Sequence, residues 1–184
     1  DHRGRKIASG IIDAGRKGAL VSLTDVYSGP GLRGIPRGTV KNLRLVTYRF
    51  GYRGMGGLLG AIGMDGPWDI KHVLGTVPVE ADGSAFFRVP AFTPISVQPL
   101  DGDGKALQLM RSWFTAMPGE TVACGGCHDG QNQATTGRRT LALEKPPAQI
   151  APWDPATRGF SFARDVQPVL DRRCVGCHDD RPAP

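Results

Sequence analysis

Two Cys-x-x-Cys-His motifs, which together use every cysteine of the chain, constrain this sequence more than any other feature. The first reads CGGCH over residues 124–128 and the second CVGCH over residues 174–178. This pattern is the attachment signature of c-type haem, because two thiols add to the vinyl groups of one porphyrin while the histidine supplies an axial nitrogen to the iron. The sequence therefore predicts two haems c per chain, bound by Cys124, Cys127, His128, Cys174, Cys177 and His178.

Paired Cys-x-x-Cys motifs also occur in zinc sites, as short disulfides and as redox dithiols. A zinc ribbon joins two such knuckles, but zinc requires no histidine after each second cysteine, and here both motifs have one. The surroundings of neither motif read as the strand–helix unit of a thioredoxin, which argues against a redox dithiol. Haem attachment is the favoured interpretation, and the others remain alternatives.

The rest of the sequence is typical of a turn-rich β protein. Its 184 residues include 26 glycines and 15 prolines. Short alternating segments recur at intervals of about ten residues, which favours an antiparallel β-sandwich. We expect strands at 19–27, 39–50, 71–80, 84–89, 93–100 and 105–113, with a hairpin at 81–83 and a tight turn at 101–104. The order of these elements resembles transthyretin-type, carboxypeptidase-regulatory-like modules.

The alternation also predicts the core and the division of the chain. The predicted core residues are Val40, Leu43, Leu45, Tyr48, Val77, Val79, Phe87, Val89, Ile95 and Val97. Apolar residues at helical spacing between Phe162 and Leu170 predict a helix that leads to Cys174. We expect an N-terminal arm (1–18), a β-sandwich domain (19–117), and a loop-rich dihaem cytochrome c segment with one or two short helices (118–184).

The second axial ligand of each iron is a separate question. Apart from the motif histidines, the chain contains only His2 and His72. Two open positions and two spare histidines predict bis-histidine ligation of both irons, an arrangement that leaves little room for a substrate. The alternative is that one or both bind no iron. His72 would then be an ordinary histidine at the entrance of a strand, and His2 an ordinary residue of the N-terminal arm. The rival ligands are Met55, Met64, Met110 and Met117.

Charge and hydropathy limit the partners. The formal net charge is +6, but the basic residues are scattered and no aromatic residues interleave with them, so we expect no nucleic-acid partner. No apolar run approaches the roughly 18 residues of a membrane span. Because c-type haem is attached outside the cytoplasmic membrane, we expect a periplasmic or extracellular location. The sequence is then either a mature exported chain or a piece of a longer one.

Three segments carry a resemblance to a known family. They are LGTVPVEADGSAFFRVPAFTPI at 74–95, LQLMRSWFTAMPGETVACGGCHDGQ at 107–131 and FSFARDVQPVLDRRCVGCHDD at 160–180. Together they resemble the C-terminal haem region of hydrazine synthase alpha-subunit-like proteins. The third also resembles the cytochrome-c-like modules common in planctomycete proteins. In that family the region usually follows a β-propeller within a longer chain, and this sequence contains no propeller.

The resemblance implies a haem-attachment scaffold rather than a particular activity. In that family the iron of the catalytic haem is held by a tyrosine shortly after the motif. Here the motif histidine His128 is followed by Asp, Gly, Gln, Asn and Gln at 129–133. The ligand that would mark that active site is missing, so the sequence predicts no catalytic residues.

Two functions are consistent with these features. The first is electron transfer by a dihaem cytochrome, with a redox partner protein or with neighbouring copies of the chain. If His2 binds the haem of a neighbour, the contact is head-to-tail and repeats into an open filament. The second is a haem oxidoreductase, similar to hydrazine synthase or to a peroxidase, in which one haem keeps an open site. The histidine count favours the first function.

Overall fold

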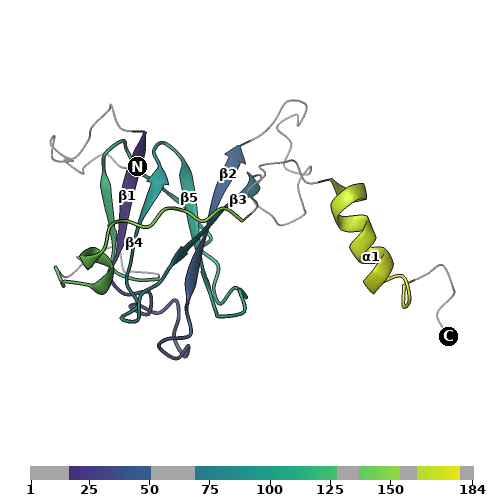
Figure 1. The fold of residues 1–184 in the computed structure, drawn as a ribbon, viewed down its shortest axis with the longest axis horizontal. Coiled ribbons are helices and arrows are strands. Elements are labelled where there is room, and N and C mark those ends of the chain that lie inside the picture. The colour runs from purple at the N-terminus through teal and green to yellow at the C-terminus, as the bar shows by residue number, and fades with distance from the viewer. Residues whose placement is uncertain (1–16, 51–68, 128–136, 154–160, 179–184) are drawn as a thin grey trace. The chain divides into compact units, whose positions relative to one another are not determined.

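Two compact units make up the chain, Asp1–Trp153 and Asp154–Pro184. A computed structural model describes residues 17–50, 69–127, 137–153 and 161–178. The mainly β architecture is confirmed, because two sheets dominate the first unit (Figure 1). The predicted domain boundaries at 18/19 and 117/118 stay predictions. The boundary between the two compact units falls in the sequence between Trp153 and Asp154.

Among the described residues, seven strands form the two sheets. The first sheet has the order β4-β1-β7, and the second the order β3-β2-β5-β6. The strands are β1 (Gly18–Leu23), β2 (Asn42–Phe50), β3 (Asp69–Pro78), β4 (Ala85–Pro90), β5 (Pro94–Leu100), β6 (Phe114–Thr115) and β7 (Thr121–Cys124). All neighbouring pairs are antiparallel except β1 and β7, which run parallel. Five of the six predicted strands are therefore present.

The turn at 81–83 differs from the predicted hairpin. Gly83 has a φ of 87° and its N–H donates to the carbonyl of Glu80, so a tight turn is present. However, β3 belongs to the second sheet and β4 to the first. The turn therefore carries the chain from one sheet to the other. An Asp-Gly pair reports the local turn but does not determine whether the flanking strands pair with each other.

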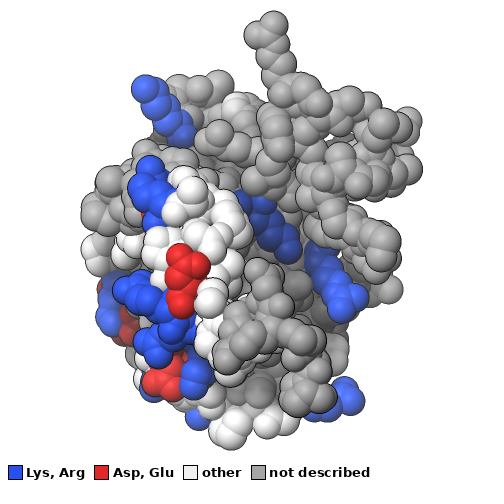
Figure 2. Space-filling model, turned by 90° about the vertical axis from the view of Figure 1, so that its right-hand side faces the viewer, with Lys and Arg blue, Asp and Glu red and all other residues white. Residues whose placement is uncertain are grey.

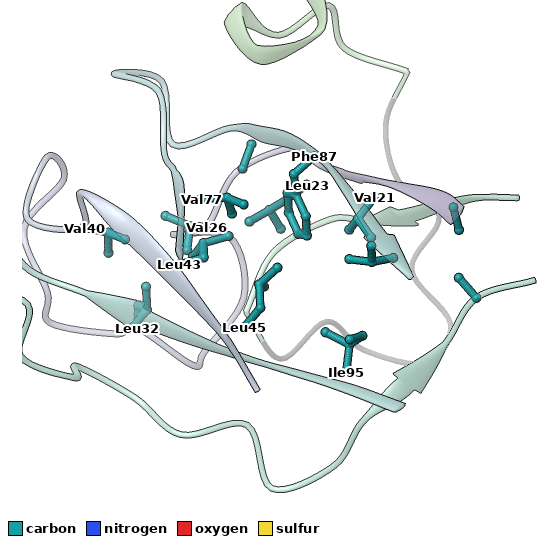
Figure 3. Close-up of a cluster of buried hydrophobic side chains, with 14 residues drawn as sticks. Val21, Leu23, Val26, Leu32, Val40, Leu43, Leu45, Val77, Phe87 and Ile95 are labelled. Carbon is teal, nitrogen blue, oxygen red and sulfur yellow. The ribbon is translucent and has the colours of Figure 1, made fainter. Parts of the chain in front are cut away.

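A single hydrophobic core lies between the two sheets, and Figure 3 shows side chains of both pointing toward one another. β1 illustrates the cause, because every second residue from Ala19 to Leu23 is buried. Eight of the predicted core residues are buried: Val40, Leu43, Leu45, Tyr48, Val77, Phe87, Val89 and Ile95. Val79 and Val97 are partly buried and pack against the core. The alternation therefore identified the core correctly.

Residues 105–113 do not form the strand that was predicted. A single bridge joins Ala106 to Leu100, and the segment then continues as an irregular loop. The carbonyl of Met110 accepts a hydrogen bond from Ser96 Oγ on β5, and the Trp113 ring lies 5.5 Å from the Tyr48 ring on β2. The segment thus covers side chains of the second sheet. Its apolar residues pack on that sheet although the segment does not pair with it as a strand.

A strap formed by residues 140–151 joins the edge strands of both sheets. It begins with η1 (Leu141–Glu144), pairs with β4 through Ala148, and pairs with β3 through Ala151. Gly75 permits the last contact, because a Cβ there would lie 2.0 Å from the Ala151 carbonyl oxygen. The strap supplies hydrogen bonds to two sheet edges that would otherwise be exposed.

The described part of the second unit is one helical segment. A π-helical turn, η2 (Phe162–Val166), continues into α1 (Gln167–Arg173), and Pro168 lies in the first turn of α1, where proline is tolerated. The predicted helix is confirmed. None of the residues in these two elements is buried. Among the described residues, no helix is long and apolar enough to cross a membrane.

Candidate haem-attachment sites

The first motif begins where β7 ends. β7 runs parallel to β1, and Cys124 is the partner of Leu23 at the end of that register. Cys124 and Cys127 are both half-buried and pack against the hydrophobic core. The first pair of thiol-bearing residues is therefore mounted on the folded β unit. The motif histidine, His128, lies outside the described residues.

The loop after β1 holds the backbone of the first motif. The N–H of Thr24 donates to the carbonyl of Cys124 at 2.9 Å, and the N–H of Asp25 donates to the carbonyl of Gly125 at 3.1 Å. Cys127 donates to the carbonyl of Val26 at 3.4 Å. Beyond these, the N–H of Gly31 donates to Cys127 at 3.3 Å. Four hydrogen bonds over four motif residues continue the strand pairing into the motif itself.

Two glycines permit this close approach. A Cβ added at Gly126 would lie 2.3 Å from the Ser28 carbonyl oxygen and 2.8 Å from that of Asp25. On the loop side, a Cβ at Gly31 would lie 2.8 Å from the Cys127 carbonyl oxygen. Real Cβ atoms do not come within 3.0 Å of backbone in this way. The second x position of this motif therefore requires glycine for reasons of space.

Asp82 ties the residues that follow the first motif to the same end of the β unit. Its carboxylate accepts hydrogen bonds from the backbone N–H groups of Ser84 and Leu141, each at 3.0 Å, and from Ser84 Oγ. Desolvation, the largest single influence, acts to raise the pKa of Asp82. The hydrogen bonds and the positive charge of Arg138 outweigh it, so the pKa lies below its usual value.

The second motif is the end of a helix. The N–H of Cys174 donates to the carbonyl of Leu170, which continues α1, and the N–H groups of Cys177 and His178 both donate to the carbonyl of Cys174. In such a turn, side chains three and four residues apart lie on one face. Cys174 is half-buried within its unit, while Cys177 and His178 are exposed. The two thiols and the imidazole are therefore available together.

The start of this helical segment is fixed by its own side chains. Ser161 accepts a hydrogen bond from the N–H of Arg164 at 3.3 Å, and Asp165 accepts one from the N–H of Ser161 at 2.8 Å. This reciprocal capping resembles a capping box and satisfies donors that the helix itself leaves open.

The spare histidines are not brought to the first motif within the described residues. His72 lies on β3 opposite Thr47 and is half-buried. β3 reaches the motif end of the unit only at Pro78, because the 81–83 turn joins Pro78 to β4 beside Leu23. The six residues from His72 to Pro78 span about 20 Å along the strand, so His72 lies far from the first motif. His2 lies outside the described residues.

The two described methionines, Met110 and Met117, give no better partner for the first motif. Met117 precedes β7, and the residues after it bond to Gly18 and pair with Leu20, so Met117 lies near the start of β7 and Cys124 at its end. Met110 lies in the loop over the second sheet. Met55 and Met64 fall outside the described residues. The distal ligands therefore stay predictions.

The donor chemistry at both motifs fits haem c. Each motif presents two cysteines at the i, i+3 spacing, and no disulfide joins any of the four. In the part of the chain that the structure describes, no three His, Cys, Asp or Glu residues gather as a metal-binding group. At the second motif, where the histidine is described, the side chains that would bind and coordinate one porphyrin share a face.

Sequence reasoning missed the loop at 24–31, which holds the first motif, and the strap, which pairs with β3 and β4. Their signals were present but ambiguous. Gly31 and Gly126 were visible as glycines in a glycine-rich chain, and nothing local indicated that they approach each other's segments. Contacts between segments so far apart in sequence arise from tertiary packing, which a single sequence does not encode locally.

Comparisons with known proteins agree with this architecture. The sequence model of the family described as "Hydrazine synthase alpha subunit middle domain" matches residues 38–129, half of the chain. A solved structure of Kuenenia stuttgartiensis hydrazine synthase is similar with a TM-score of 0.68 and 20% identity. The match covers 92% of this chain and 30% of that one. No curated protein sequence matches significantly.

The family match starts near the end of the 24–40 loop, spans β2 to β7, and ends just past the first motif. It therefore contains the second sheet and the strand that presents Cys124. At 20% identity the structural likeness shows the fold, and this chain spans less than a third of the hydrazine synthase chain it matches. The resemblance seen in the sequence is confirmed: this chain belongs to the family of the hydrazine synthase alpha subunit middle domain.

Proposed function

We propose that this chain is a dihaem c-type cytochrome that carries electrons. The observation that carries the proposal is the second motif, where a helical turn aligns Cys174, Cys177 and His178 on one face. A bound haem c supplies a one-electron iron couple. The chain supplies thiols for covalent attachment and an imidazole for the iron, and the family relationship to hydrazine synthase agrees with a haem protein.

The first motif supports a second haem in a different way. Its two cysteines are half-buried at the edge of a packed core, and hydrogen bonds fix the backbone of residues 124–127. This keeps the two thiols in a set position before any porphyrin arrives. Pre-organisation of this kind reduces the conformational entropy lost on attachment.

The residues after the first motif favour electron transfer over catalysis. No tyrosine occurs between His128 and the end of the chain, so the tyrosine ligand that the family resemblance would require is not supplied there. A bis-histidine iron is six-coordinate and leaves no position for a substrate. We therefore propose His72 and His2 as distal ligands.

The family relationship favours one alternative, a haem oxidoreductase with an open site. Spin state separates the two functions. The as-isolated ferric protein should give low-spin electron paramagnetic resonance and near-infrared signals from both haems if both irons have two strong ligands. A stable high-spin signal from one haem would favour the enzyme. The matched variant is His72→Ala, for which we expect one haem to become high-spin while the covalent haem content is unchanged.

Haem content is the first test of the proposal. A pyridine haemochrome assay on the full chain, matured with the c-type haem attachment machinery, should give two haems per chain. The double variant Cys174→Ser with Cys177→Ser should give one. A haem-free chain that binds zinc at both motifs would overturn the proposal.

Location and partners are inferred from the same chemistry. Covalent attachment outside the cytoplasmic membrane implies a periplasmic or extracellular protein. The family is named for one subunit of a larger enzyme, so we propose a redox partner protein or companion subunit. The face in Figure 2 shows acidic side chains beside basic ones on its described part, so a partner would meet mixed charge there. A head-to-tail polymer through His2 remains the alternative partner arrangement.

A further inference from the structure

The Arg37 side chain bridges Asp25 and Asp82 beside the loop that bonds to the first motif, and we call this bridge the clamp. One oxygen of the Asp25 carboxylate accepts a hydrogen bond from the N–H of Tyr27 at 3.0 Å, and the other accepts one from Arg37 Nη1 at 2.9 Å. The second terminal nitrogen, Arg37 Nη2, donates to the carbonyl of Asp82 at 2.9 Å. The Arg37 guanidinium also lies 5.0 Å from the centre of the Tyr27 ring. Tyr27 in turn accepts a hydrogen bond from the N–H of Val40 at 2.8 Å.

The clamp bears directly on the motif through Asp25. The backbone N–H of Asp25 donates to Gly125, and its carbonyl oxygen is one of the atoms that a Cβ at Gly126 would meet. The side chain and the backbone of one residue therefore join the clamp to the Cys-x-x-Cys segment. Through the Asp82 carbonyl, Arg37 also reaches the residue whose carboxylate holds Leu141, which comes after the motif in sequence.

We propose that Arg37 is a positioning residue for the first haem: its clamp on Asp25 and Asp82 sets the spacing and orientation of Cys124 and Cys127 for attachment. This inference rests on the proposed function. Arg37 acts through the loop, because its hydrogen bonds go to Asp25 and Asp82. Its fork geometry suits the task, because a guanidinium holds two acceptors at fixed angles.

The clamp should contribute little to the global stability of the β unit. The Arg37 side chain is 56% exposed and that of Asp25 is 17% exposed, and ion pairs open to solvent contribute little to global stability. Loss of the clamp should therefore change the local setting of residues 124–127 more than the stability of the β unit. The second motif belongs to a separate compact unit, which makes it an internal reference in the same molecule.

The test compares Arg37→Gln with Arg33→Gln in the full chain, matured with the haem attachment machinery. Arg33 is an exposed residue of the same loop, and the control removes the same charge. Peptide mass spectrometry measures the fraction of each motif that carries haem, and thermal unfolding is recorded in parallel. We expect Arg37→Gln to lower haem at the first motif several-fold relative to the second, with the Arg33→Gln protein unchanged.

A conservative variant sharpens the result. Arg37→Lys keeps the charge but a single ammonium cannot hold Asp25 and the Asp82 carbonyl in the same fork, so we expect an intermediate ratio. An unchanged ratio in Arg37→Gln, or an equal loss at both motifs, would overturn the inference while leaving the proposed function standing. If the unsubstituted chain carried no haem at the first motif, the proposed function would itself fail there.

Discussion

The two Cys-x-x-Cys-His motifs share a sequence pattern but are held by unlike surroundings. The first continues a β-strand, packs against a buried core and is held by four backbone hydrogen bonds from a neighbouring loop. The second is the last turn of a helical segment in which no residue is buried. The same five-residue signature is therefore compatible with a packed β scaffold in one case and, among the described residues, with a single helical segment in the other.

This difference has a consequence for folding. Because the β unit has its own hydrophobic core, we expect it to be compact without a porphyrin. The helical segment 162–173 is at the length where isolated helices are marginal in water, and its apolar Phe162 and Val169 are 61% and 47% exposed. A covalent haem at Cys174 and Cys177 would give these side chains an apolar surface. We expect the first site to be preformed and the second to be stabilised by haem.

Removing a core side chain should give the largest difference in stability between the two units. Phe87 is 1% exposed on β4, and Phe87→Ala should lower the free energy of unfolding of the β unit by about 3–5 kcal/mol. Val169→Ala, at an exposed helical site, should change stability by under about 0.5 kcal/mol. Urea titrations followed by circular dichroism measure both. Equal effects of the two substitutions would mean that the helix has a core of its own.

The motif glycines offer the closest matched pair. Gly126 and Gly176 occupy the same motif position, but a Cβ at Gly126 would lie 2.3 Å from Ser28 O, whereas nothing lies within 4 Å at Gly176. Gly126→Ala should destabilise the β unit by about 1–3 kcal/mol through overpacking and reduce haem at the first motif. Gly176→Ala should leave stability and haem content unchanged. A tolerated Gly126→Ala would contradict the described packing of the loop on the motif.

Acid should loosen the first site through Asp82, with a smaller effect than either substitution above. The pKa of Asp82 is lowered in the folded state, so its stabilising contribution is present above the unfolded value of about 3.9 and is lost as the pH falls through the lower folded value. The free energy of unfolding of the β unit should therefore fall below about pH 4. Asp82→Asn should reduce this dependence in urea titrations across that range. An identical pH profile in the variant would show that other carboxylates account for it.

How much the sequence revealed depends on whether the signal was local. Alternation in β2 and β4 reflects burial on one face, and it identified Leu45, Phe87 and Val89 as core. Helical spacing found the segment before Cys174. The predicted strand at 105–113 was wrong because apolar residues over a sheet face alternate much as a strand does. The pairing of β3 and β4 in different sheets depends on long-range contacts that an Asp-Gly turn does not report.

For the candidate sites, too, only the features with a local sequence signal could be predicted. The four cysteines, His128 and His178 were predicted as haem-attachment residues because haem attachment needs a fixed local spacing in the sequence. These assignments stay predictions. The Asp25–Arg37 clamp, the close approach of Gly126 to Ser28 and the strap on Gly75 were missed. Each of these joins segments distant in sequence, and only the folded chain brings them together.

Intact mass spectrometry of the matured chain tests the central claim most directly. The unsubstituted protein should carry the mass of two haems that survive denaturation and acid extraction. Cys124→Ser with Cys127→Ser should remove one haem, and Cys174→Ser with Cys177→Ser should remove the other. A chain that retains no covalent haem, or that keeps both haems in either double variant, would contradict the assignment of one haem to each motif.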